Sequence, residues 1–343
     1  MKRNLIFILL IVNTSFIFAL PQFSKIKTVS CGKQPKQVLY SYDKKYLVLP
    51  LLDDTGFEVF TCDATKKIKI SPPMAEKKGF AEGLFIEEKK AFFVSQMTTG
   101  NIYEYSYNPK ADITQAFTYR RTINTQGQWS KFIAWSKEKN MLAVSNWISN
   151  DVSLIDYESG NVIKKIKTGL APRGLNFING GKEIIVLCFD SGEIQKFDTL
   201  TASKINEIKI EKAAMRHIAV NQEETFAFVS DMYHACIYKI NLASFTICAK
   251  WKVFNNPNTI ALLQNKYVLV SSRGPNNPLS YTQRSPVNGK ISLLDCSDGR
   301  LIQSIEGGNQ PTGLALSPDQ SELAFTNFQD ANFVILSINE SLP

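Results

Sequence analysis

Short runs of apolar and β-branched residues, each of strand length, recur along this chain from residue 25 to its end. In the clearest unit, residues 141–177, three such runs occupy 141–145, 152–156 and 162–167, and polar turns separate them. Runs of this length that are bounded by Gly, Asn, Asp and Ser predict β-strands joined by tight turns.

The run at 141–145 is one of seven equivalent runs, spaced 41 to 55 residues apart. They read YLVLP from residue 46, AFFVS from 91, MLAVS from 141, EIIVL from 183, FAFVS from 226, YVLVS from 267 and ELAFT from 322. A strand-rich, helix-poor repeat of this period is typical of a propeller with four strands per blade. Several runs are apolar at successive positions, as expected for sheets buried on both faces. The sequence therefore predicts an all-β fold, a seven-bladed β-propeller of four-stranded antiparallel blades.

The two ends of the chain are predicted to close the ring. Only six blades are followed by their own fourth strand, and the last repeat ends at its third strand, residues 332–338. The segment SKIKTV at 24–29 is similar to KKIKTG at 164–169, which includes a fourth strand. Pairing of 24–29 with 332–338 would remove two exposed sheet edges, which otherwise promote aggregation.

The first nineteen residues have the pattern of a signal peptide. Lys2 and Arg3 precede an apolar run that extends to Leu20, and cleavage is expected after Ala19. An uncleaved N-terminal membrane anchor is the alternative. No later apolar stretch is long enough to cross a bilayer. We therefore expect a signal peptide at 1–19 and a single propeller domain at 20–343, located in the periplasm or secreted.

Charge and cysteine content narrow the partners and the covalent links. The formal net charge is +8, and removal of Lys2 and Arg3 leaves +6, a moderate excess that favours anionic partners. The dense basic runs of a nucleic-acid binder are absent from the sequence. Six cysteines form no CxxC pair. Cys236 and Cys248 lie symmetrically about the turn at 241–244, so a cross-strand disulfide is one hypothesis and free thiols are the other.

The segment SNDVSLIDYESGNVIKKIKTG at 149–169, followed by PRGL at 172–175, resembles the YVTN repeat β-propeller family. Many members of that family are secreted or periplasmic. The resemblance covers essentially the whole mature chain and implies the propeller fold. For function it implies a binding platform, while related propellers include enzymes.

Propeller ligands are expected at the mouth of the channel, between two sets of loops. The loops from fourth to first strands offer Lys36, Trp129, Lys131, Arg173, Arg216, His217 and Asn258. The loops from second to third strands offer Asp53, Asp54, Asn146, Trp147, Asp190, Asp231, Tyr233, His234, Arg273 and Asn327. An insertion rich in Pro, Asn and Gly at 273–289 adds Tyr281 and Arg284. The selected binding candidates are Lys36, Trp129, Trp147, Arg173, Arg216, His217, Asp231, Tyr233, Arg273, Tyr281 and Arg284.

Four of these candidates are cations predicted to ring one mouth of the channel: Lys36, Arg173, Arg216 and Arg273. Two outcomes are open. The cations attract an anionic partner, or the loop acids Asp53, Asp54, Asp190 and Asp231 neutralise them. If the ring binds an acidic partner, replacing Arg173 and Arg273 together with Ala should weaken binding and leave stability nearly unchanged, because exposed ion pairs contribute only about 0–1 kcal/mol.

Both histidines of the chain are expected near the fifth blade's hairpin, where Arg216 and His217 lie beside Ser230 and Asp231. Three interpretations compete. Asp231 and the histidines bind a metal ion, Asp231 orients His217 as a general base, or an acid–base pair simply stabilises the hairpin end.

Two functions from different classes follow. The first is an exported, non-catalytic platform that binds a protein, a peptide or an anionic envelope polymer, as a monomer and without a cofactor. The alternative is a lactonase-like hydrolase that uses the channel mouth. A metal-dependent hydrolase needs several converging acids or amides, and the first-strand starts supply only Glu82 and Asn258. The GxSxG motif of serine hydrolases is absent from the sequence.

Overall fold

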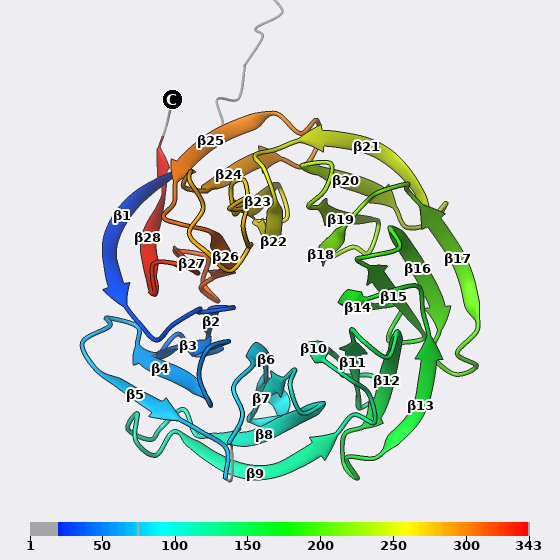
Figure 1. Cartoon of the computed structure of the whole chain (residues 1–343), viewed down its shortest axis with the longest axis horizontal. Helices are drawn as coiled ribbons and strands as arrows, with labels where there is room; N and C mark the ends of the chain where they lie inside the picture. Colours follow the sequence, from blue (N-terminus) through cyan, green and yellow to red (C-terminus); the bar gives the residue numbers. More distant parts are fainter. Residues whose placement is uncertain (1–19, 74–75, 342–343) are drawn as a thin grey trace, which may run out of the picture.

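The computed structural model describes residues 20–73 and 76–341, so the predicted signal peptide at 1–19 lies outside the described residues. Seven four-stranded antiparallel sheets are arranged as blades around a central channel (Figure 1). The predicted fold class is confirmed. Among the residues that the structure describes there is no helix with the length and apolar character needed to traverse a bilayer.

The blades are numbered in chain order, and their strands run outward from the channel. Blades 1 to 3 comprise β2 (Leu39–Tyr40), β3 (Tyr46–Pro50), β4 (Phe57–Thr61), β5 (Lys67–Ile70); β6 (Phe80–Ile86), β7 (Ala91–Gln96), β8 (Asn101–Tyr107), β9 (Phe117–Asn124); and β10 (Ser130–Ser136), β11 (Met141–Asn146), β12 (Asp151–Asp156), β13 (Val162–Lys167). Blades 4 and 5 comprise β14 (Pro172–Ile178), β15 (Glu183–Cys188), β16 (Glu193–Asp198), β17 (Lys204–Lys209); and β18 (Met215–Val220), β19 (Phe226–Asp231), β20 (Cys236–Asn241), β21 (Thr246–Lys252). Blades 6 and 7 comprise β22 (Pro257–Leu263), β23 (Tyr267–Ser272), β24 (Lys290–Asp295), β25 (Leu301–Glu306); and β26 (Pro311–Leu316), β27 (Glu322–Asn327), β28 (Asn332–Ser341), β1 (Leu20–Ser30). One 3₁₀ turn, η1 (Glu87–Lys89), joins β6 to β7.

The core lies between neighbouring blades, which explains the continuous apolar runs in the inner strands. Ala143 and Leu154 of blade 3, for example, are buried in one cluster with Leu175 and Val186 of blade 4. A strand that is covered by a blade on each side gains from apolar residues at every position, because no face is left to water.

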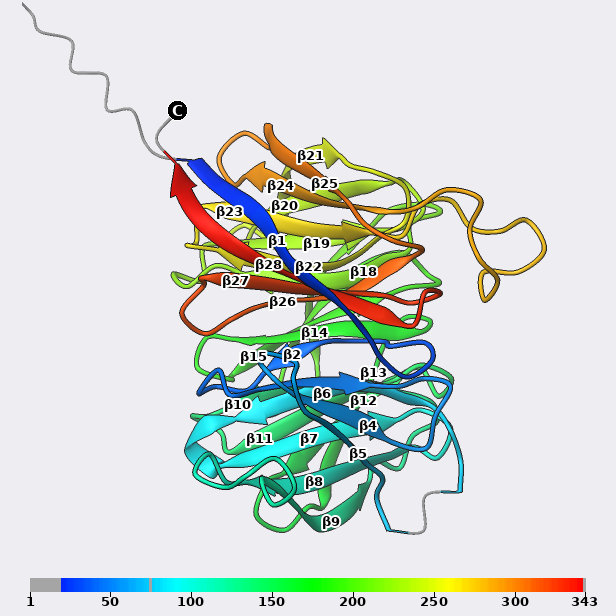
Figure 2. The same ribbon diagram turned by 90° about the vertical axis from the view of Figure 1, so that its left-hand side faces the viewer.

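The ring is closed by the N-terminal strand, as predicted from its sequence. β1 pairs antiparallel with β28, with Ser24 opposite Ser337 and Val29 opposite Phe333. The far ends of these two strands reach one side of the ring, whereas the 273–289 loop projects from the opposite side (Figure 2). The face that carries this loop is therefore remote from both described chain ends.

A bulge at the start of each first strand aims residues at the channel. In blade 4, Pro172 pairs with Cys188 and Leu175 with Val186, so two residues of β14 stand opposite one of β15. The same shift occurs in β6, β10, β18, β22 and β26. We call the first extra residue the bulge position. From blade 1 to blade 7 it is occupied by Lys36, Ala81, Lys131, Arg173, Arg216, Asn258 and Thr312.

Buried serines near the ends of second strands fix these bulges. Ser145 Oγ accepts the N–H of Phe132 at 3.1 Å and donates to the carbonyl of Arg173, in the next blade, at 2.9 Å. Ser95, Ser230 and Ser271 make the equivalent two contacts, one to a backbone N–H of their own blade and one to a carbonyl of the next blade. The recurring Val-Ser ending of these strands thus ties each blade to its neighbour at the level of the bulge position.

The hypothesised disulfide between Cys236 and Cys248 is wrong. Cys236 stands opposite Lys252, while Cys248 falls at a register shift between the Lys239–Ala249 and Ile240–Ile247 pairs. The turn lies later than 241–244, because Asn241 pairs with Thr246. All six cysteines are free thiols.

Candidate binding site at the channel mouth

A cavity of about 310 Å³ opens at the channel mouth and gathers most of the residues nominated from the sequence. Its lining consists of Lys36, Trp129, Lys131, Trp147, Arg173, Phe189, Arg216, Met232, Arg273, Asn276 and Tyr281. We call it the mouth pocket. Five blades contribute to it, so the pocket exists only when the ring is assembled.

The mouth pocket is built from two sets of equivalent positions. The bulge positions of blades 1, 3, 4 and 5 supply Lys36, Lys131, Arg173 and Arg216. The residues directly after the second strands of blades 3 to 6 supply Trp147, Phe189, Met232 and Arg273, whose N–H groups all donate back to the loop that enters their own blade. A cationic set therefore lies beside a largely apolar one.

The arginines of the mouth pocket are buried, which corrects the expectation of exposed cations. The exposed fraction is 1% for Arg173 and 5% for both Arg216 and Arg273. Side chains from several blades converge on the channel and cover the arginine stems, while the loop positions seen in the sequence suggested solvation.

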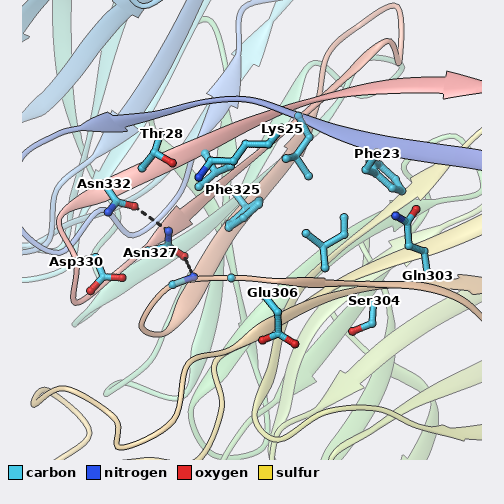
Figure 3. Close-up of a pocket in the computed structure, with 15 residues that line it drawn as sticks. Phe23, Lys25, Thr28, Gln303, Ser304, Glu306, Phe325, Asn327, Asp330 and Asn332 are labelled. Carbon is cyan, nitrogen blue, oxygen red and sulfur yellow. Dashed lines mark hydrogen bonds between the residues drawn. The ribbon is translucent and has the colours of Figure 1, made fainter.

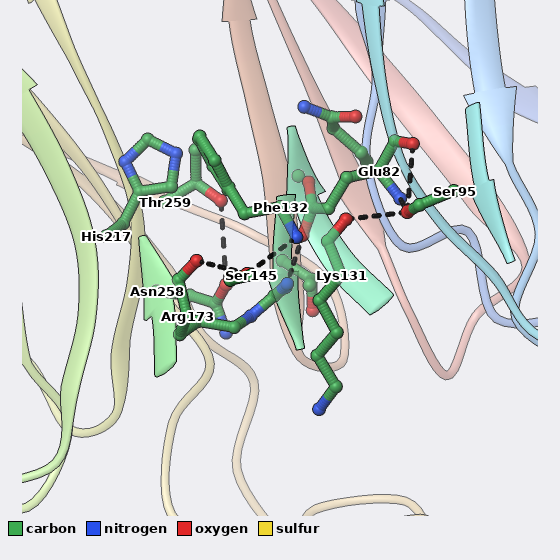
Figure 4. A network of polar contacts seen from close by, with 12 residues as sticks. Glu82, Ser95, Lys131, Phe132, Ser145, Arg173, His217, Asn258 and Thr259 are labelled. Atoms are coloured by element: carbon green, nitrogen blue, oxygen red, sulfur yellow. Dashed lines mark hydrogen bonds and ion pairs between the residues drawn. The ribbon is translucent and has the colours of Figure 1, made fainter. Parts of the chain in front are cut away.

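One buried ion pair spans the pocket. Arg173 of blade 4 contacts Glu82 of blade 2, and Figure 4 shows both residues in one network with Ser95 and Ser145. Because both partners are buried, removal of either would leave an uncompensated charge in a medium of low polarity.

Three of the four loop acids pair elsewhere, and the fourth, Asp190, acts on Lys131 through its charge without forming an ion pair with it. Asp53 pairs with Lys78 at 2.7 Å, Asp54 pairs with Lys69, and Asp231 pairs with His234 at 2.7 Å. Within the described residues, Lys36, Lys131, Arg216 and Arg273 form no ion pair with a carboxylate. Basic side chains in the pocket therefore outnumber the carboxylates paired with them.

Burial, and for the two lysines the neighbouring cations, lower the pKa values of basic side chains in the pocket. Burial, followed by the charges of Arg216, Arg273, Arg173 and Lys131, lowers the pKa of Lys36 well below its usual range. Burial and then Arg173 and Arg216 likewise lower the pKa of Lys131, although Glu82 and Asp190 oppose the shift. Burial lowers the pKa of Arg273 to about 10. An anion in the pocket would relieve this repulsion.

Aromatic rings lie against three of the cations, and the Lys36 ammonium is 5.3 Å from the ring centroid of Phe328. The Lys131 ammonium lies 3.4 Å from the ring centroid of Trp147, which packs against Phe189 at 5.0 Å. The Arg273 guanidinium lies 5.9 Å from the ring centroid of Tyr281 and 5.3 Å from that of Phe328. Cation–π contacts of this kind orient a charge without neutralising it.

The remaining candidates lie outside the pocket lining. His217 is half-buried behind it, with its ring 5.4 Å from that of Phe132, and desolvation followed by Arg216 and Arg173 lowers its pKa to about 3. Asp231 does not orient His217. It pairs with His234, accepts from the Tyr238 hydroxyl at 3.2 Å and caps backbone N–H groups, so it stabilises the hairpin end.

Tyr233 is exposed on the rim, and the ring of His234 packs against it at 5.1 Å. Arg284 pairs with Asp330, which holds the insertion against blade 7. The described residues contain no group of three or more His, Cys, Asp and Glu side chains that could hold a metal ion.

Sequence reasoning missed Phe189, Met232 and Asn276 as lining residues. The selection favoured polar side chains. It therefore took Asp190, which follows Phe189, and Asp231, which precedes Met232. Phe189 and Met232 directly follow the last paired residue of their second strands, as Trp147 does in blade 3. Aligning the ends of the second strands would therefore have found both.

The comparisons with known proteins place this chain in a family. It is 33% identical over 318 residues to antigen Lp49 of Leptospira interrogans, and the match covers 90% of this chain and 67% of that protein. The chain belongs to the antigen Lp49 family. No protein-family model matches the chain, so the similarity to YVTN repeat propellers stays a resemblance.

A second cavity in this Lp49-family chain, of about 420 Å³, lies on the outer side of the ring between β1 and β25 (Figure 3). Its charged lining is mixed, with Lys25, Glu306 and Asp330. Asn327 crosses it, donating to Asn332 at 2.7 Å and accepting from the N–H of Gly308 at 2.8 Å. None of the selected candidate residues lines this cavity.

Proposed function

We propose that this chain is an exported, non-catalytic binding propeller whose mouth pocket holds an acidic group of a protein or peptide partner. The observation that carries the proposal is the imbalance of charge in the pocket. Five basic side chains line it, three of them buried arginines and two of them half-buried lysines, and Glu82 pairs with Arg173 alone. Proteins rarely bury unpaired charges, and those they retain commonly serve binding or catalysis.

The rim of the same face favours a protein partner over a polar polymer. Large exposed apolar side chains gather on the loops around the pocket, namely Trp129, Ile148, Leu170, Tyr233, Leu279 and Tyr281. Aromatic and aliphatic anchors around a desolvated charged centre are typical of protein interfaces. The described chain ends lie on the other side of the ring, so they leave this face accessible (Figure 2).

An exported location is supported by two observations. The N-terminal sequence has the pattern of a signal peptide. The relative is named an antigen, and immune recognition favours a protein exposed at the surface or secreted. Fractionation of the native host, with the protein followed by mass spectrometry, should find it outside the cytoplasm and beginning at Leu20. Recovery of residues 1–19 on a cytoplasmic protein would reject this part of the proposal.

A labelled glutamate-rich peptide is the first probe for the pocket. Fluorescence anisotropy with residues 20–343 should give binding that weakens as ionic strength rises, whereas a lysine-rich peptide should not bind. Arg216→Met should weaken binding. Arg300→Ala is the matched control, because Arg300 lies in a turn between third and fourth strands, at the end of the blade remote from the pocket.

Equal binding by the wild type and Arg216→Met would exclude the mouth pocket as the site. Binding of a polyanionic glycan with no binding of the glutamate-rich peptide would replace the protein partner by a polymer.

A further inference from the structure

The mouth pocket holds more basic side chains than carboxylates, and this imbalance constrains the charge of its ligand. Lys36, Lys131, Arg173, Arg216 and Arg273 all line the cavity. After the Arg173–Glu82 pair, four cations are left without a carboxylate among the described residues. A single carboxylate would leave most of this repulsion in place, and the residual cost of burial would count against its binding.

Unused hydrogen-bond donors point the same way. Arg173 Nη1, Arg216 Nη1 and Arg273 Nε are buried, and no group in the described part of the chain accepts from them. They come from three different blades, yet all three side chains line one cavity. A guanidinium donates through a planar fork that matches carboxylate or phosphate oxygens. Donors that come from three different blades are satisfied more readily by two acidic groups or a phosphate than by one carboxylate, whose acceptor sites all lie on two adjacent oxygens.

Part of the cavity lining is apolar. Trp147, Phe189 and Met232 line it, and Trp129 and Tyr281, which are 41% and 55% exposed, stand at its entrance. A volume of about 310 Å³ is near the lower end of the range for small-molecule sites, roughly 300–1,000 Å³. The space therefore fits a charged group and a flat apolar body of modest size.

From this geometry we infer that the mouth pocket binds an oxyanion with at least two negative charges, carried on an aromatic or apolar body. This inference rests on the proposed function and names the chemistry of the group that enters the pocket. In a protein partner, adjacent acidic residues or a phosphorylated residue beside an apolar side chain would supply it.

A set of small probes separates charge from shape. Isothermal titration calorimetry of residues 20–343 would compare benzoate, phthalate, phenyl phosphate and inorganic phosphate at one pH and salt concentration. Phthalate and phenyl phosphate should bind at least about tenfold more tightly than benzoate, because their second negative charge allows one more charge-assisted hydrogen bond to an arginine. Inorganic phosphate should bind more weakly than phenyl phosphate, since it lacks the apolar body.

The two dianions also distinguish the two sources. Phthalate stronger than phenyl phosphate indicates paired carboxylates, and the reverse indicates a phosphate. Arg216→Met should reduce phthalate and phenyl phosphate affinity by a larger factor than benzoate affinity, and Arg300→Ala should change neither.

The inference fails if benzoate binds as tightly as both dianions. It also fails if Arg216→Met weakens all probes by the same factor. In either case, retained binding of the glutamate-rich peptide to the wild type, with loss in Arg216→Met, would leave the proposed function standing. Failure of that peptide to bind the wild type would reject the function itself.

Discussion

Blades 4 and 2 share the same backbone bulge but place different kinds of side chain on it. In both, a bulge at the start of the first strand places one residue towards the channel, Arg173 in blade 4 and Ala81 in blade 2. Blades 1, 3 and 5 follow blade 4 with a cation at this position. Blades 6 and 7 follow blade 2 with the uncharged Asn258 and Thr312. The repeat therefore fixes where a side chain points, while the side chain itself decides whether that blade contributes charge.

The difference separates structural from functional demands on one repeated position. Stability alone would favour neutral residues throughout, because a buried unpaired cation is costly. Cations occupy four of the seven positions, three of them without a carboxylate partner among the described residues, and all four share one cavity with aromatic residues. The pattern favours selection for a ligand on the cationic side of the channel.

The largest loss of stability should come from opening the ring at blade 7, one of the blades with no cation at the bulge position. Removal of residues 20–30 deletes β1 and exposes β28 as a sheet edge. We expect a loss of about 5 kcal/mol or more, since each backbone hydrogen bond contributes about 0.5–1.5 kcal/mol. Melting followed by circular dichroism and size-exclusion chromatography should show a lower Tm and self-association.

A chain lacking only residues 1–19 is the control for this truncation and should melt as a closed ring. Equal melting of the two truncated chains would mean that β1 is dispensable and that the cationic blades are stable without closure.

The next effect separates cations within the pocket. Arg173→Met should destabilise the protein by about 3–5 kcal/mol, because Glu82 would remain buried without its partner. Arg216→Met should leave stability unchanged or raise it, because Arg216 has no carboxylate partner among the described residues and is desolvated beside Arg173. Urea unfolding of both variants tests this. A loss for Arg216→Met as large as that for Arg173→Met would show that Arg216 is a structural residue.

How far the sequence predicted this molecule depends on the range of the interactions involved. The blades follow from local patterns such as the Val-Ser strand endings, and ring closure follows from the similarity of 24–29 to 164–169. Both predictions are confirmed. The error at Cys248 has a local cause, because one extra residue in β21 shifts the register and sequence symmetry about a turn does not reveal it.

Burial in the pocket could not be read from the sequence, because it is set by five blades that converge from distant parts of the chain. Arg173 looked like an exposed loop cation and is buried against Glu82, 91 residues away. Phe189 was passed over for its polar neighbour Asp190, although only Phe189 lines the cavity.

A smaller effect tests whether the buried serines set the bulges. Ser145→Ala would leave the N–H of Phe132 and the carbonyl of Arg173 without their partner. The expected loss is about 1–3 kcal/mol in urea unfolding. Ser145→Thr should retain most of the stability, because Thr326 fills the equivalent position in blade 7 and accepts the N–H of Gly313 at 2.8 Å. Equal stability of the Ala and Thr variants would mean that the serine hydroxyls do not stabilise the bulges.

The smallest effect is one of protonation, and it reports on the cationic side of the channel without disturbing the fold. Burial, Arg216 and Arg173 lower the pKa of His217 from 6.5 to about 3. The folded protein should therefore keep His217 neutral from pH 8 down to pH 5, while the unfolded chain takes up a proton near pH 6.5. Stability should then fall as pH drops below 6.5, because only the unfolded state binds this proton. NMR of the His217 ring, assigned with His217→Gln, should show no titration between pH 5 and 8. In Arg216→Met the pKa should rise, since a neighbouring cation is lost. A His217 that titrates near pH 6.5 in the wild type would mean that water reaches the ring and that the cations beside it are hydrated rather than held ready for an anion.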